Sequence, residues 1–138
     1  MCVCRAHVEN AQAIAEFLEQ QPQVEYVNTP DFHPINTMLW RKKYLGNGGC
    51  GVVSFNLKGG RKAAEEFMKR LQLAAIETHV ADARTCCLNP ATTTHRQMTD
   101  EQLAVAGIPA GLVRLSCGLE DKEDLLADLQ QALAGIAG

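Results

Sequence analysis

The spacing of apolar residues predicts amphipathic helices in three parts of the chain. In the first, Ile14 and Leu18 fall on one face while Glu16 and Glu19 turn away from it. Apolar residues recur at the same spacing in two later segments. The last predicted helix begins among acidic residues, which interact favourably with the partial positive charge at a helix N-terminus. The predicted helices cover residues 8–20, residues 62–71, and the segment from 120 onward that buries Leu125, Leu129 and Leu133.

Short β-branched and apolar runs predict strands over residues 24–27, 52–57, 85–88 and 112–117. A further, less regular helix is expected over 36–45. Thr99 and Gln102 form a T-x-x-Q capping box, so a short helix should begin there and end near Gly107. Helices and strands alternate, with connections too short for a second core. We therefore expect one domain, 1–138, folded as an α/β (α+β) sandwich with about four strands and helices mainly on one face.

Composition and charge narrow the possible partners. The chain has 138 residues and a net charge of −3, with no basic face, which argues against nucleic acid as a partner. No apolar run approaches the roughly 18 residues of a spanning helix, and no signal-peptide pattern opens the chain. We expect no membrane partner and a cytoplasmic location.

The six cysteines favour buried thiols over a metal site. Cys86 and Cys87 are adjacent in an apolar run, where cysteine behaves as a small hydrophobic residue. Cys2, Cys4 and His7 resemble part of a zinc site. However, one residue separates the two cysteines where zinc sites usually have at least two, and the sequence has no second pair of ligands at suitable spacing. No metal is expected.

Arg114 is the candidate functional residue that stands out from pattern alone, because it interrupts the apolar run 112–117. A guanidinium is always charged, so placing it among apolar neighbours is costly unless a carboxylate or phosphate pairs with it. Spacing leaves two explanations open. Arg114 binds an external anion, or it forms a structural ion pair with an acid such as Asp82 or Glu120.

Several motifs in order resemble a known family. They are GGCGVVSFNLKGG (48–60), THVADARTCCLNPATTTHRQMTDEQL (78–103) and GLVRLSCGLED (111–121), preceded by HVENAQAIAEFLEQQPQVEYVNTPDF (7–32). Together they resemble the C-terminal domain of the Cys/Met-metabolism family of pyridoxal-phosphate (PLP) enzymes. The run THVADART is most similar to the O-acetylhomoserine sulfhydrylase branch of that family.

The resemblance assigns roles to individual residues. It implies that Arg114, in the RLS motif, binds the α-carboxylate of the amino-acid substrate, and that His79 and Val80 lie on a loop that approaches the same group. His79 stands where relatives more often have Ser or Asn, and a solvated or core histidine is an equal alternative. The supporting residues implied around this site are Asp82, Arg84, Thr85, Thr94 and His95. Spacing further suggests that Asp82 and Arg84 pair locally.

The resemblance also implies what this chain lacks. In the family, a separate large domain carries the Schiff-base lysine and the phosphate-binding groups. The six lysines here lie on polar faces or beside turns, and no glycine-rich phosphate loop is visible. We expect no catalytic residue and no cofactor on this chain alone. The expected partners are the missing N-terminal PLP-binding domain, a substrate of O-acetylhomoserine type and, through an exposed docking surface, further copies of the chain.

The implied activity is homocysteine synthesis from O-acetylhomoserine and sulfide by the full-length enzyme, with PLP as its cofactor. Methionine γ-lyase and cystathionine γ-synthase or lyase are alternatives within the family. An alternative of another class is a free-standing amino-acid-binding or interaction domain without catalysis.

Overall fold

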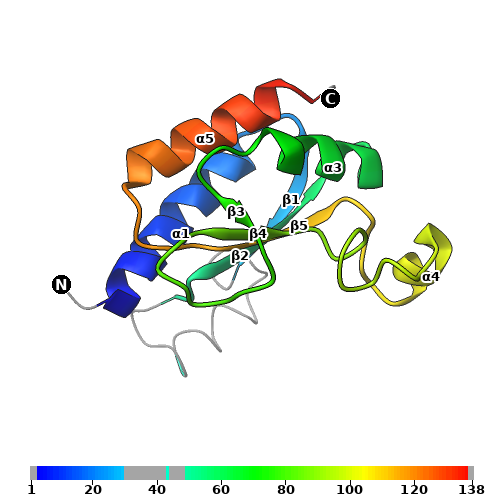
Figure 1. The fold of residues 1–138 in the computed structure, drawn as a ribbon, viewed down its shortest axis with the longest axis horizontal. Coiled ribbons are helices and arrows are strands. Elements are labelled where there is room, and N and C mark those ends of the chain that lie inside the picture. The colour runs from blue at the N-terminus through cyan, green and yellow to red at the C-terminus, as the bar shows by residue number, and fades with distance from the viewer. Residues whose placement is uncertain (1–2, 30–42, 44–48, 137–138) are drawn as a thin grey trace.

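The computed structural model describes residues 3–29, 43 and 49–136 (Figure 1). These residues form four helices and five strands. In chain order the elements are α1 (Val3–Glu19), β1 (Val24–Asn28), β2 (Val52–Leu57), α3 (Gly60–Arg70), β3 (Ala75–Ile76), β4 (Cys86–Leu88), α4 (Asp100–Val105), β5 (Leu112–Ser116) and α5 (Lys122–Ala134). The helix expected over 36–45 lies outside the described residues except for Lys43.

The strands form one mixed sheet in the order β1-β2-β5-β4-β3. Neighbouring strands are antiparallel except for β3 and β4, which are parallel. The expected α/β class is confirmed, with five strands instead of about four. The additional strand, β3, has only two residues, too few to show an alternating pattern in the sequence. Its parallel pairing with β4 defines it, with Ala75 opposite Cys86 and Ile76 opposite Cys87.

Helices α1, α3 and α5 pack on the same face of the sheet (Figure 1). The apolar stripes predicted from spacing are buried there, as Ile14 and Leu18 show. At the centre of this layer, the rings of Phe55 on β2 and Phe67 on α3 meet edge to face, with centroids 5.6 Å apart. Among the described residues, no helix combines the length and the apolar character needed to cross a lipid bilayer.

Helix α1 begins at Val3, five residues before the predicted start, so Cys4 and His7 belong to its first turns. His7 is half-buried, and its Nδ1–H donates to the Cys117 carbonyl oxygen. This close packing depends on Gly51, because a Cβ there would lie 3.0 Å from the His7 Cβ. The Thr99 and Gln102 capping box is confirmed at the start of α4.

Candidate functional site

Arg114 lies in the middle of β5, between Ser54 of β2 and Leu88 of β4. Its neighbours Val113 and Leu115 are fully buried in the helix-covered core. Side chains alternate between the two faces of a strand, so Arg114 belongs to the opposite face. The arginine that interrupts the apolar run therefore lies outside the hydrophobic core, on the face of the sheet opposite α1, α3 and α5.

The guanidinium of Arg114 is only partly satisfied by its surroundings. Its Nη2 donates to the Thr78 carbonyl oxygen at 2.9 Å, while Nε is shielded from solvent and has no hydrogen-bond partner among the described residues. No carboxylate of the described residues pairs with it, so the predicted alternative of an ion pair to Asp82 or Glu120 is wrong. A charged donor that is buried and unpaired is costly, and an external anion would relieve that cost.

The loop 77–85 contacts β5 through Arg114 and Ser116, on the face of the sheet opposite α1, α3 and α5. It joins the parallel strands β3 and β4, and its main chain is held by the Ser116 hydroxyl, which accepts from the Ala81 N–H at 3.0 Å. Further along, the Leu119 N–H donates to the Ala83 carbonyl oxygen at 2.8 Å. Ala81 adopts φ 60°, a left-handed conformation that costs an alanine roughly 1–2 kcal/mol. The contacts with β5 and the segment after it hold the loop in this course.

His79 and Val80 lie on this loop. They follow Thr78, whose carbonyl oxygen accepts from Arg114, by one and two residues. The His79 side chain is 64% exposed, with Nδ1 3.1 Å from a Glu77 carboxylate oxygen and 3.8 Å from one of Asp82. Val80 is 54% exposed and lines an apolar cavity of about 160 Å³ that reaches His7 on α1. Substrate contact by His79 and Val80 stays a prediction.

Asp82 and Arg84 are joined through the main chain. Asp82 Oδ1 accepts from the Arg84 N–H at 3.1 Å, which makes a tight turn, and no ion pair between their side chains is present in the described structure. The predicted pairing of the two side chains is therefore wrong, although the contact still helps to shape the loop.

Thr85 ends the loop and is almost completely buried. Its N–H and its hydroxyl donate to the two carboxylate oxygens of Glu120, at 2.6 and 2.8 Å. The Gly118 N–H donates to the Thr85 hydroxyl at 2.8 Å. From α1, the Asn10 side-chain amide donates to the Gly118 and Glu120 carbonyl oxygens, each at 3.0 Å. The sequence did not suggest this role for Glu120 or Asn10, because each partner is distant along the chain.

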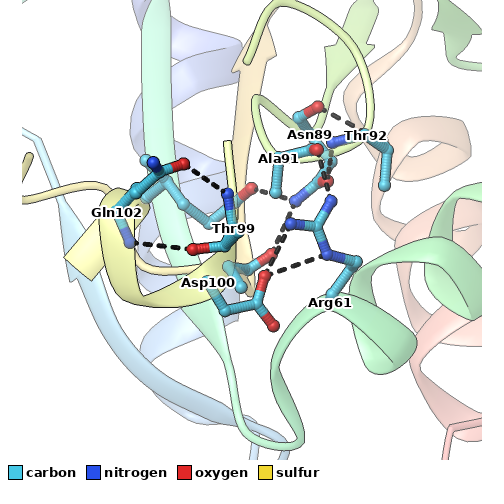
Figure 2. Close-up of polar contacts among 9 residues, drawn as sticks. Arg61, Asn89, Ala91, Thr92, Thr99, Asp100 and Gln102 are labelled. Atoms are coloured by element: carbon cyan, nitrogen blue, oxygen red, sulfur yellow. Dashed lines mark hydrogen bonds and ion pairs between the residues drawn. The ribbon is translucent and has the colours of Figure 1, made fainter. Parts of the chain in front are cut away.

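Thr94 and His95 belong to a separate polar region that begins at Asn89. Figure 2 shows Asn89 and Thr92 of this region. Asn89 is fully buried, donates to the carbonyl oxygens of Ala110 and Leu112, and accepts from the Thr92 N–H. Thr94 Oγ1 and His95 Nδ1 lie 2.8 Å apart, and within the described chain no hydrogen bond links them to Arg114. Their predicted supporting role is untested.

Arg61 connects this region to α3 (Figure 2). Its guanidinium lies 2.6 Å from an Asp100 carboxylate oxygen and donates to the Ala91 carbonyl oxygen. Through these contacts the segment that carries α4 is tied to the helix-covered side of the molecule. Local sequence patterns could not reveal this contact, since the two charges are 39 residues apart.

The buried cysteine thiols of the core are unreactive at neutral pH. Burial raises the pKa of Cys117 to about 12 and raises the pKa of Cys87 further still, so both stay protonated at neutral pH. In residues 3–29, 43 and 49–136, no group of three or more His, Cys, Asp or Glu side chains is arranged to hold a metal ion.

The described lysines do not provide a Schiff-base site. All of them are exposed, and several are used in surface contacts: Lys58 Nζ donates to the Pro22 carbonyl oxygen at 2.7 Å, and Lys69 pairs with Glu66 at 3.2 Å. A Schiff-base lysine must lie where the cofactor can be enclosed and held. These side chains do not fit that requirement, so no chemical step through PLP is assigned to the described residues.

Comparison of the sequence with known families identifies the class of protein to which this sheet and its arginine belong. A profile of the Cys/Met metabolism PLP-dependent enzyme family matches residues 3–134. The chain belongs to this family.

Curated relatives come from more than one branch of the family. The chain is 45% identical over 130 residues to O-acetyl-L-homoserine sulfhydrylase 1 of Thermus thermophilus, covering 93% of this chain and 30% of that protein. It is 40% identical over 131 residues to O-acetyl-L-homoserine sulfhydrylase of Leptospira meyeri, with 94% and 30% covered. It is 44% identical over 131 residues to L-methionine gamma-lyase of Pseudomonas putida, with 95% and 33% covered.

A solved structure of similar fold supports the assignment to this family. It is a protein of Campylobacter jejuni provisionally assigned as an O-acetylhomoserine (thiol)-lyase, with a pyridoxyl-lysine monophosphate in its chain. The two folds superpose with a TM-score of 0.85 at 34% identity, over 96% of this chain and 31% of the other. The present chain therefore spans about a third of the length of the relatives that it matches.

Proposed function

We propose that this chain is the substrate-binding C-terminal part of a PLP-dependent O-acetyl-L-homoserine sulfhydrylase, which makes homocysteine from O-acetyl-L-homoserine and sulfide. In this proposal Arg114 binds the substrate α-carboxylate, His79 and Val80 line the same site, and the Schiff-base lysine belongs to an N-terminal domain outside this chain. Self-association and a cytoplasmic location are part of the same proposal. The observation that carries it is the unpaired, solvent-shielded Nε of Arg114.

A carboxylate suits this arginine because two parallel N–H donors of a guanidinium match its two oxygens. Thr78 accepts one N–H of Nη2, so the other donors at the exposed end of the guanidinium are left for the incoming group. Fixing the carboxylate orients the amino acid, which leaves its Cα–H bond directed toward the base on the other domain. When bound, PLP supplies the electron sink for elimination and addition.

Two other outcomes are distinguished by experiment. Methionine γ-lyase activity has support from the 44% identity to the Pseudomonas putida enzyme. Cystathionine γ-synthase or lyase activity would use the same carboxylate contact. An amino-acid-binding or interaction domain without catalysis would bind homoserine derivatives by itself, and calorimetric titration of the 138-residue chain would then show a measurable affinity. The proposal predicts almost none.

The decisive test is a chimera in which this chain replaces the matching part of the Thermus thermophilus relative. Homocysteine formation from O-acetyl-L-homoserine and sulfide is compared with turnover of methionine and of cystathionine. The proposal predicts the first activity. Arg114→Gln should lower kcat/KM about 10²-fold or more, as expected when one partner of a buried charge pair is lost.

The matched control is Arg96→Gln, which removes the same charge from an exposed position. It should leave kcat/KM unchanged. Wild-type kcat/KM in the Arg114→Gln chimera would contradict the carboxylate role, and preference for methionine or cystathionine would reassign the branch.

A further inference from the structure

The conformation of the Arg114 side chain depends on the loop 77–85. Within the described residues, its one hydrogen bond goes to the Thr78 carbonyl oxygen in that loop. A free arginine side chain samples many rotamers and loses this conformational entropy when it is fixed. A displaced loop would therefore leave the guanidinium without the contact that orients it.

The loop itself has no regular secondary structure between its two strands. Parallel neighbouring strands are usually joined by a crossover of a dozen or more residues containing a helix, whereas here nine residues make the connection. The course of such a loop is set by individual anchors. The strongest of these lies at its end, where Thr85 meets a carboxylate.

Glu120 supplies that carboxylate, and both of its oxygens accept hydrogen bonds from Thr85. Bonds to an ionised acceptor are about twice as strong as neutral ones. The approach is so close that a Cβ on Gly118 would lie 2.5 Å from a Glu120 oxygen. Asn10 fixes the main chain on both sides of this turn from α1. The anchor therefore ties the end of the loop to a core helix.

We propose that Glu120 is a positioning residue for Arg114, and that it acts through Thr85 and the loop 77–85. The inference rests on the proposed role of Arg114 as the carboxylate-binding group. Glu120 touches neither substrate nor cofactor in this proposal. It keeps the Thr78 carbonyl group where it orients the guanidinium, and displacements of about 1 Å at such a group can lower catalysis about 10²-fold.

The first test is nuclear magnetic resonance of the 138-residue chain, observing the Nε–H groups of its arginines. Thr85→Val keeps the side-chain volume and removes the hydroxyl, whereas Thr85→Ser keeps the hydroxyl. We expect Thr85→Val to shift the Arg114 Nε–H signal and to speed its exchange with water about tenfold or more, as for a locally opened site. Thr85→Ser should restore wild-type behaviour.

Two controls separate positioning from general loosening. The Nε–H of Arg61, which is bonded to Asp100, should keep its signal in every variant. Glu120→Gln should change the Arg114 signal in the same direction as Thr85→Val, whereas Glu123→Gln, at an exposed acid nearby, should not. An unchanged Arg114 signal in both Thr85→Val and Glu120→Gln would overturn the inference.

The second test is a double-mutant cycle in the chimera. Thr85→Val should lower kcat/KM about tenfold in the wild-type background and have no further effect in the Arg114→Gln background, because both changes act on one contact. If Arg114→Gln alone is harmless, the proposed function fails and takes the inference with it. If Arg114→Gln is impaired and Thr85→Val is harmless or multiplicative, only the role of Glu120 fails. If Thr85→Val does not fold, Glu120→Gln takes its place in the cycle.

Discussion

Replacing Asp128 with asparagine should destabilise the fold strongly. Asp128 lies on α5 with 6% of its surface exposed, and its two carboxylate oxygens accept from three consecutive main-chain N–H groups. Oδ1 accepts from Gln72 at 2.8 Å, and Oδ2 accepts from Leu73 and Ala74 at 3.0 Å each. The Gln131 side-chain amide adds a fourth donor, also at 3.0 Å. The carboxylate thus holds the segment that follows α3.

The magnitude follows from the number of donors. Asparagine keeps one oxygen and replaces the other with an NH₂ group, which points a donor at other donors. Hydrogen bonds to a charged group contribute roughly 1.5–3 kcal/mol each, and a buried N–H left unpaired costs roughly 1–3 kcal/mol. Because Asp128→Asn loses at least one such bond, we expect it to lower the free energy of unfolding by about 2–4 kcal/mol.

The pH dependence gives an independent check. Burial tends to raise the pKa of Asp128, but the hydrogen bonds from Ala74, Gln72 and Leu73 outweigh it and hold the pKa below its usual value. A carboxyl with a lowered folded-state pKa stabilises the fold above its unfolded value of about 3.9, and this contribution disappears as pH falls through the folded pKa. The difference between wild type and Asp128→Asn should therefore shrink in strong acid.

Urea unfolding followed by circular dichroism at pH 7 and near pH 2.5 measures both effects. Asp124→Asn is the matched control, one turn earlier on α5 and exposed, and should cost less than about 1 kcal/mol. Equal losses in the two variants at pH 7, or a loss in Asp128→Asn that is independent of pH, would refute the reasoning.

Three further outcomes are expected. Gly118→Ala should cost at least about 2 kcal/mol, because its Cβ would lie 2.5 Å from a main-chain oxygen, and an unchanged thermal midpoint would count against this. Asn89→Ala should cost about 2–4 kcal/mol by leaving buried carbonyl groups without donors, which urea unfolding would detect. Iodoacetamide should label Cys4 in the folded chain but reach Cys87 and Cys117 only after unfolding, as read by mass spectrometry. Early labelling of either buried thiol would show that the core opens.

Local patterns predicted the helices and longer strands well. The apolar spacing of Ile14 and Leu18 predicted which face of α1 is buried, and the capping box of Thr99 and Gln102 predicted the start of α4. Both signals could be read because each lies within a few residues of sequence. The start of α1 was placed too late, since Cys4 and His7 carry no strong helical signal. The two-residue strand β3 was missed because a strand that short has no detectable period.

The polar contacts that shape the site were beyond local patterns. Arg114 could be singled out because a charge in an apolar strand is conspicuous, but only the structure showed that no acid among the described residues pairs with it. Asp128 reads in sequence as one acid among several on an amphipathic helix, whereas its donors lie 54 to 56 residues earlier. Likewise, Glu120 is 35 residues from Thr85. Such contacts depend on the tertiary arrangement.

The order of the strands constrains when this molecule can assemble during synthesis. The strand nearest the carboxyl end, β5, is the one in the middle of the sheet, with β2 on one side and β4 on the other. While a ribosome is still translating the codons before it, the earlier strands form two separate groups with exposed edges. Unpaired edges favour association with other chains. The two groups can join into one sheet only after β5 has been synthesised.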